Sequence, residues 1–383
     1  MTDRNALLLS IPTSVPTAAF ADLDDLYDLV GHNTGNLAFV YAIDQHLGGG
    51  VTRFARHEKP EVVNAASESI AVLPCANHLN PAQDLEGEAR IFASYEKPMV
   101  AIGLGAQGPL ALDPVPDLPE GSVRWLREMA ERAPGDAPNI SVRGEFTQRV
   151  LDKYGVAESS VVLGCPSLFI NPAEDLGRRI EAAAENPIRR VAVTSGHYRW
   201  RHLHRLERSL AQMVEDTRGS YIVQSPFEMI AAARAAWDRV PPEDRSLIKE
   251  SIGRDSESTD SVEEFYRNYS IAFFDAPAWM NYYRNFDFVV GPRIHGVMLA
   301  IQAGVPGMCV AHDSRVLELC ETMGVPYVRA GDVADGVDLS DLRRLFKFDG
   351  AEIDARRREL LSDYRTFLTS NGLDLSFDLR AAH

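Results

Sequence analysis

The sequence has no long uninterrupted hydrophobic stretch. None of its apolar runs approaches the roughly 18 to 20 residues that a membrane-crossing helix needs. Near the amino end a short apolar run follows Arg4, but Pro12 and Pro16 interrupt it, which fits a first β-strand and a loop better than a secretory leader. We therefore expect a cytoplasmic protein with no membrane span.

Cysteine is scarce and unclustered. There are 4 cysteines, Cys75, Cys165, Cys309 and Cys320, and no two of them have a C-x-x-C spacing. This distribution predicts neither a zinc site nor a disulfide framework, and it favours reduced thiols. We expect no bound metal.

Basic residues are outnumbered by acidic ones. The chain carries 39 Lys and Arg against 55 Asp and Glu, a formal net charge of −16. Sequence-independent binding to nucleic acid needs a broad basic face, so nucleic acid is not an expected partner. An anionic substrate would need a local cluster of Arg and His to overcome the negative field of the whole protein.

Strand-like and helix-like segments alternate along the chain, without repeats or low-complexity tracts. In 383 residues this alternation predicts an α/β fold of two doubly wound, Rossmann-like domains that face a cleft. The segment 172–187 separates an N-terminal domain over 1–172 from a C-terminal domain over 188–338. The charged helical tail over 339–383 is expected to pack back across the domains.

The segment 286–306 contains the most informative pattern. An apolar strand ends at Gly291-Pro292, and an apolar helix follows and ends at Gly304. Arg293 and His295 lie at the junction, beyond the carboxyl end of a strand, where α/β folds bind ligands. Helix-start amides and a guanidinium favour an anion there. Burial of Arg293 against a core carboxylate and of His295 as a core imidazole is the other interpretation.

A second junction of the same kind occurs earlier in the chain. The short strand over 139–142 ends at Arg143, and an amphipathic helix follows. A surface ion pair would explain one such arginine. Two at equivalent junctions of two α/β units fit better with two halves of one anion site.

Two glycine-containing loops also lie at the ends of predicted elements. Asn33 and Gly35 lie in a turn that leads into a helix, and Gly103 and Gly105 end a strand. Such loops allow close approach of the backbone to a ligand, but tight turns need the same residues.

The most basic stretch lies between His197 and Arg208. It holds four Arg, three His and one acid, Glu207. The arginines disfavour a metal site. His197 and Arg199 are therefore predicted either to contact an anion across the cleft or to belong to a solvated helix start.

Several motifs together resemble those of the polysaccharide pyruvyl transferase family. The residues that carry the resemblance are Asn33-Thr34-Gly35-Asn36, Ile102-Gly103-Leu104-Gly105, Ser141-Val142-Arg143-Gly144-Glu145, Gly164-Cys165-Pro166-Ser167, Gly291-Pro292-Arg293-Ile294-His295-Gly296 and Ala303-Gly304-Val305-Pro306. The chain departs from the family at Asn36 and Cys165, where the family often has Asp.

The resemblance implies a fold similar to the GT-B glycosyltransferases and transfer of a pyruvyl group from phosphoenolpyruvate. The acceptor would be a sugar or glycan, free or lipid-linked, and the product a pyruvate ketal. Arg143 and Arg293 would hold the donor's phosphate and carboxylate, and His295 would act as a proton donor. No cofactor is implied, because side chains supply the cations.

Two other functions fit the same chain. A nucleotide-sugar glycosyltransferase would need a ribose-binding carboxylate at a late helix start, for which Glu318 is the available residue. A non-catalytic carbohydrate-binding protein would not need the arginines and the histidine. The general base has four candidates, His32, Glu145, His197 and Asp313, although Asp313 is better placed as a helix cap.

Overall fold

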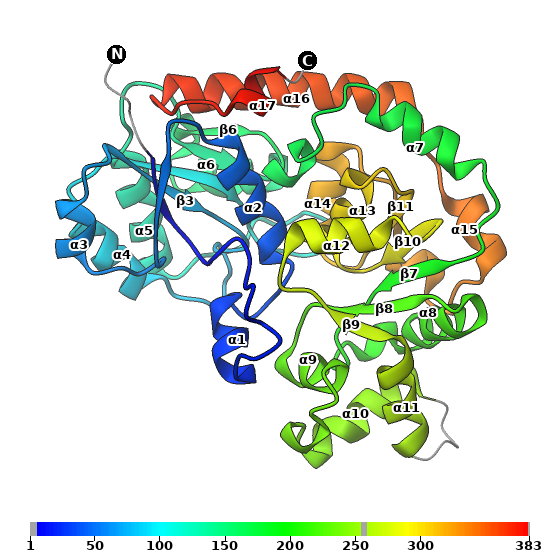
Figure 1. The fold of residues 1–383 in the computed structure, drawn as a ribbon. Helices are drawn as coiled ribbons and strands as arrows, with labels where there is room; N and C mark the ends of the chain where they lie inside the picture. The colour runs from blue at the N-terminus through cyan, green and yellow to red at the C-terminus, as the bar shows by residue number, and fades with distance from the viewer. Residues whose placement is uncertain (1–5, 254–258, 382–383) are drawn as a thin grey trace.

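The computed structural model describes residues 6–253 and 259–381. Two six-stranded sheets form the centre of the molecule, with helices on their faces (Figure 1). Every strand pair in both sheets is parallel. This arrangement confirms the predicted α/β class with two doubly wound units.

The first sheet has the strand order β2-β1-β3-β4-β5-β6. Its inner strands β1, β3 and β4 are buried along their whole length, as a parallel sheet covered on both faces requires. The strands are β1 Ala6–Leu9, β2 Val51–Phe54, β3 Ile70–Pro74, β4 Met99–Leu104, β5 Ile140–Val142 and β6 Ser160–Val162. The helices are α1 Leu23–Leu29, α2 Asn36–His46, α3 Pro60–Ala65, α4 Glu86–Ala93, α5 Glu120–Glu131 and α6 Glu145–Lys153.

The second sheet has the order β12-β11-β10-β7-β8-β9. Its strands are β7 Val191–Thr194, β8 Ser220–Val223, β9 Ser270–Ala272, β10 Phe288–Gly291, β11 Gly307–Ala311 and β12 Tyr327–Arg329. The helices here are α7 Leu176–Ala184, which leads into the sheet, α8 His204–Thr217, α9 Phe227–Ala233, α10 Pro242–Ile252, α11 Thr259–Tyr269, α12 Ala276–Tyr283, α13 Ile294–Gln302 and α14 Ser314–Met323. Strand order changes direction between β7 and β10, which is the kind of position where open α/β sheets form a ligand crevice.

Some local predictions are confirmed and others are wrong. Asp313 caps α14 as predicted, with its side chain accepting from the Val316 amide. The polar composition of residues 251–261 predicts a loop, but α10 continues to Ile252 and α11 begins at Thr259; residues 254–258 lie outside the described part. No helix within the described ranges is long and apolar enough to cross a membrane.

One segment near the amino end crosses to the second sheet. The Val15 amide donates to the Phe274 carbonyl at 2.8 Å. Leu23, Leu26 and Val30 belong to the hydrophobic cluster that also contains the residues of β7, β8 and β10. The domain bounds stay a prediction. The packing of this crossing segment against the second sheet must be taken into account in them.

The C-terminal segment forms α15 Leu339–Leu345, α16 Gly350–Ser370 and α17 Phe377–Ala381. The long helix α16 runs across both halves of the molecule (Figure 1). Helix α16 packs against α7 and contacts α14. The expectation that the tail packs back is confirmed.

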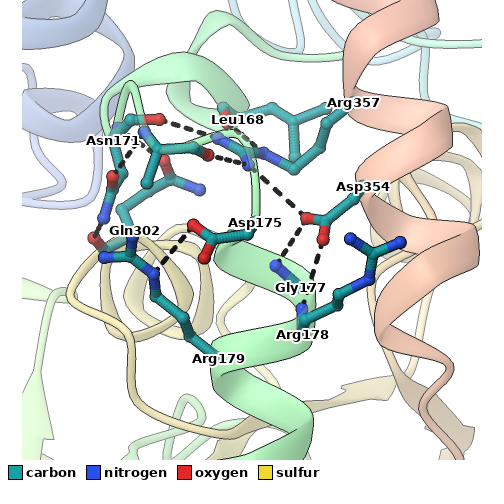
Figure 2. Close-up of polar contacts among 10 residues, drawn as sticks. Leu168, Asn171, Asp175, Gly177, Arg178, Arg179, Gln302, Asp354 and Arg357 are labelled. Carbon is teal, nitrogen blue, oxygen red and sulfur yellow. Dashed lines mark hydrogen bonds and ion pairs between the residues drawn. The ribbon is translucent and has the colours of Figure 1, made fainter. Parts of the chain in front are cut away.

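Two buried charges of α16 hold the linker between the sheets (Figure 2). The Arg357 guanidinium donates to the carbonyls of Asn171 at 2.7 Å and Ala173 at 2.9 Å. The Asp354 carboxylate accepts from the Gly177 amide at 2.6 Å, at the start of α7. Because these partners are main-chain groups, the linker path is fixed by hydrogen bonds as well as by apolar packing.

Candidate active site

A cavity of about 100 Å³ lies between the two sheets, and both predicted junctions open onto it. Arg143 follows β5 of the first sheet, and Arg293 follows β10 of the second and is the N-cap residue of α13. His295, in the first turn of α13, also lines the cavity. The structure therefore brings Arg143 together with Arg293 and His295, which lie 150 and 152 positions further along the sequence.

Two hydrogen bonds fix the side chain of Arg143. Its Nε donates to the Gly103 carbonyl at 3.0 Å, and one terminal nitrogen donates to Asn77 Oδ1 at 2.9 Å. A side chain at Gly105 would place its Cβ 2.7 Å from Arg143 Cδ, so glycine is needed there for the arginine to pass. The other terminal nitrogen is buried and has no hydrogen-bond partner among the described residues. A buried guanidinium with an unused donor is suited to an anion.

Arg293 reaches the cavity from the second sheet. Its guanidinium lies over the Trp200 ring, 4.8 Å from the ring centroid, and one terminal nitrogen donates to the Ser225 carbonyl at 3.3 Å. Its Nε is buried and lacks a partner within the described chain. Stacking on an aromatic ring fixes the plane of the guanidinium and leaves its edge free for hydrogen bonds.

His295 is buried beside a thiol and an aromatic ring. Its Nε2 lies 3.6 Å from Cys165 Sγ, and its ring centroid is 5.4 Å from that of Phe39. Burial, and after it the charge of Arg143, lower the imidazole pKa to about 3. His295 is therefore neutral at neutral pH while the cavity holds no anion.

The cations of the cavity destabilise one another. Burial, and after it the charge of Arg315, lowers the pKa of Arg293 to about 10, and burial also lowers the pKa of Arg143, with Arg315 acting in the same direction. Burial also lowers the pKa of His312 to about 4, and Arg293 and Arg315 act in the same direction. A bound anion would relieve this repulsion. The cavity is thus the local cluster of Arg and His that an anionic substrate would need in so acidic a protein.

Five further lining residues were not predicted as site residues, and each lies near the end of a strand or at a helix start. Asn77 comes shortly after β3, Gln224 follows β8, and His312 follows β11. Arg315 stands in the first turn of α14 and pairs with Asp313. Trp200 completes the set, with its ring centroid 4.2 Å from that of His312. The signal that could have found them is their place after buried strands.

Of the residues predicted in the two glycine-containing loops, one lines the cavity and the glycines do not. Asn33 lines the cavity, and its Oδ1 accepts from the Gly35 amide at 2.9 Å. Gly35, Gly103 and Gly105 are not lining residues. Gly35 and Gly105 leave room for polar side chains of the site, whereas Gly103 has a positive φ of 81°. At Gly35, for example, a Cβ would lie 2.5 Å from Gln224 Oε1.

The basic stretch is largely neutralised by acids distant in sequence. Arg199 pairs with Asp244 at 2.8 Å and its side chain is 59% exposed. His197 lies next to Trp200, with ring centroids 5.7 Å apart, and burial followed by the charges of Arg293 and Arg199 lowers its pKa to about 4. Neither residue belongs to the cavity lining.

Fold and cavity together define a two-domain α/β protein with a cationic crevice between its sheets. The family model for polysaccharide pyruvyl transferase matches residues 33–314, most of the 383-residue chain. The chain belongs to this family. The match includes Arg143, Arg293 and His295. The name of the family denotes a transferase of pyruvyl groups, in agreement with the resemblance in the sequence motifs.

Three solved structures with some likeness to the chain are distant in sequence. S. aureus MnaA in its co-structure with UDP has a TM-score of 0.42 and 10% identity, over 98% of this chain and 93% of that one. Glycyrrhiza uralensis UGT73P12 with glycyrrhetinic acid 3-O-monoglucuronide has 0.39 and 12%, over 96% of each. The glycosyltransferase SnogD from Streptomyces nogalater has 0.32 and 13%, over 95% of each. We draw no conclusion from scores this low. No curated protein matches the chain.

Proposed function

We propose that the protein transfers the pyruvyl group of phosphoenolpyruvate to two hydroxyls of a sugar, as a pyruvate ketal, with release of phosphate. One observation carries the proposal: two arginines from facing sheets line one cavity together with His295, and each has a buried N–H donor without a partner. This statement of missing partners refers to the described residues.

The charges of the cavity suit such a donor. Arg143, Arg293 and Arg315 supply three positive charges, and the lining carboxylate of Asp313 offsets one of them. Phosphoenolpyruvate carries a phosphate and a carboxylate, and each of the two guanidinium groups can donate charge-assisted hydrogen bonds to one of these anions. Each charge-assisted pair would contribute about 1.5–3 kcal/mol.

The proposed reaction needs two new carbon–oxygen bonds and breaks one. The oxygen of the first hydroxyl bonds to C2 of the donor while C3 takes a proton and becomes a methyl group. The bond from C2 to the phosphate oxygen then breaks, and the second hydroxyl oxygen bonds to C2. Of the two hydroxyl protons, one replaces the proton given to C3 and the other leaves on the phosphate, so atoms and charge balance.

His295 is the proposed proton donor. The bound phosphate and carboxylate would oppose the effect of Arg143 and raise the imidazole pKa from about 3, which prepares the ring to deliver a proton. His312 is the proposed acceptor of a hydroxyl proton, because it is neutral and lines the same cavity. Side chains supply the positive charge, and we propose no cofactor besides the donor.

The structure gives no support to Glu318 as a ribose-binding residue. Its carboxylate accepts from the Thr147 amide at 2.6 Å and from the Thr147 hydroxyl at 2.9 Å, across the interface between α14 and α6. It is therefore occupied within the protein, which removes the residue that the nucleotide-sugar alternative requires. The four cysteines are free and buried, which fits transfer in the reducing cytoplasm.

Calorimetric titration with phosphoenolpyruvate and, separately, with UDP tests the proposal. We expect wild type to bind phosphoenolpyruvate and Arg293→Ala to lose at least about tenfold in affinity, equivalent to the loss of one charge-assisted contact. Arg127→Ala, at an exposed position of α5, is the matched control and should bind like wild type. Binding of UDP but not phosphoenolpyruvate, or equal binding by Arg293→Ala, would reject the proposed donor site.

A further inference from the structure

A second, larger cavity adjoins the first. It has a volume of about 310 Å³ and shares Asn36, Ala76 and Asn77 with the cavity between the arginines. Its volume falls at the lower end of the range for small-molecule sites. The three shared lining residues place the two cavities next to each other.

The second cavity lies at the direction change of the first sheet. Its lining includes Ile11, shortly after β1, and Pro74, the last residue of β3. Strands β1 and β3 are neighbours, and the chain order changes direction at β1. Crevices at the carboxyl ends of strands on both sides of such a change bind ligands in open α/β sheets.

The lining combines amide groups with apolar surface. Asn36 Nδ2 donates to the Val30 and Gly31 carbonyls at 3.1 Å, which fixes the orientation of its amide. Asn77 Oδ1 accepts from Arg143, so Asn77 connects the second cavity to the donor arginine. Phe39 and Val40 supply apolar surface. Oriented amides beside apolar walls are the groups that bind the hydroxyls and ring faces of a sugar.

Arg56, the one arginine or lysine among the described residues that line this cavity, is already neutralised by Glu88. Arg56 Nε pairs with Glu88 Oε1 at 2.7 Å, one terminal nitrogen donates to the Pro74 carbonyl at 2.8 Å, and the other contacts the His78 ring. Glu88 is also 3.1 Å from His57 Nε2. Each nitrogen of the guanidinium thus has a partner inside the protein. A carboxylate or phosphate on the bound molecule would have to compete with Glu88 and would lie in an acidic protein.

We infer that this second cavity binds the acceptor and that the sugar ring within it is uncharged. The inference rests on the proposed function, because it takes the first cavity to hold the donor. Asn36 and Asn77 would then position hydroxyls next to Arg143 and His295. Because each nitrogen of Arg56 already has a partner, the Arg56–Glu88 pair disfavours a uronic acid or a sugar phosphate at this position.

The experiment compares p-nitrophenyl hexosides as acceptors in an assay of phosphate release from phosphoenolpyruvate. Neutral glucoside, galactoside and mannoside are measured against the glucuronide. We expect at least one neutral glycoside to have a kcat/KM at least about tenfold above that of the glucuronide. A glucuronide that is the best acceptor would overturn the inference.

Glu88→Gln tests the role of charge directly. The amide oxygen can still accept from Arg56, but the guanidinium is no longer neutralised, so the ratio of glucuronide to glucoside kcat/KM should rise about tenfold. The matched control is Glu86→Gln on the same helix, whose carboxylate pairs with Arg90 and Arg124 instead. An unchanged ratio in a folded Glu88→Gln protein would contradict the inference.

Ile11→Trp provides a second test that does not depend on Glu88. The larger side chain fills part of the second cavity, and we expect the KM for the neutral acceptor to rise about tenfold while the calorimetric Kd for phosphoenolpyruvate stays the same. If wild type does not bind phosphoenolpyruvate, the proposed function fails. If the donor binds and Ile11→Trp leaves the acceptor KM unchanged, only the placement of the acceptor fails.

Discussion

The contact between Glu318 and Thr147 predicts an unusual dependence of stability on pH. Glu318 lies on α14 and is 3% exposed. Its carboxylate accepts two hydrogen bonds from Thr147 in the first turn of α6, which begins two residues after Arg143. This contact therefore joins α14 to α6 close to Arg143.

Burial raises the pKa of Glu318 from 4.5 to about 7, and the opposing effects of Thr147 and Arg143 do not cancel it. A raised pKa in the folded chain means that folding favours the protonated acid. The stabilisation is complete below pH 4.5 and is lost as pH rises through 7. With these two pKa values, ionisation costs the folded state about 0.8 kcal/mol at pH 5 and about 3.3 kcal/mol at pH 8, a difference of about 2.5 kcal/mol.

Urea unfolding of wild type and Glu318→Gln at pH 5 and pH 8 measures this difference. The glutamine does not titrate, and its oxygen and NH₂ can still bond to the Thr147 amide and hydroxyl. Relative to wild type, we expect the unfolding free energy of the variant to increase by about 2.5 kcal/mol between the two pH values. Glu321→Gln, at an exposed position of the same helix, should show no such change. A constant difference for Glu318→Gln would refute the argument from burial.

Three other changes have defined outcomes. Arg357→Leu leaves the linker carbonyls without their buried donor and should lower the unfolding free energy by about 3 kcal/mol, measured in urea. Gly105→Ala forces Arg143 to move and should weaken phosphoenolpyruvate binding about tenfold in calorimetry. Cys165→Asp places a carboxylate beside His295 and should raise its pKa from about 3 by at least about one unit, measured by NMR of the imidazole.

Each of these has a control or a contradicting result. Arg358→Leu, at the neighbouring exposed position of α16, should be nearly neutral; equal losses for both leucine variants would mean that the linker bonds add nothing. Gly87→Ala meets no atom within 4 Å and should bind the donor like wild type. An unshifted imidazole in Cys165→Asp would show that position 165 does not face His295 in solution.

The sequence predicted the parts of the site that are encoded locally. Arg143, Arg293 and His295 stand at strand–helix junctions that can be recognised from a few neighbouring residues, and the structure brings all three to one cavity. The buried inner strands were predicted for the same reason, because each is an apolar run between turn residues. The edge strands β2 and β12 were missed, since both are short and only partly buried.

The remaining lining residues depend on packing between distant segments. Nothing near Asn77 in the sequence indicates that its amide meets Arg143, which lies 66 positions away. The same limit applies to Arg199, whose partner Asp244 is 45 positions away. This partner neutralises a charge for which the sequence left an anion contact open. The local sequence pattern predicts on which element a side chain lies. Its hydrogen-bond or ion-pair partner is determined only by the fold.

The crossing of Val15–Val30 to the second sheet has a consequence for how the protein can be made. The core of the second sheet includes Leu23, Leu26 and Val30, so a fragment over 188–383 would expose the apolar surface that these residues cover. A fragment over 1–172 would carry the same side chains without their packing partner. Neither fragment should be soluble when expressed alone, whereas co-expression of the two should restore a complex that purifies together.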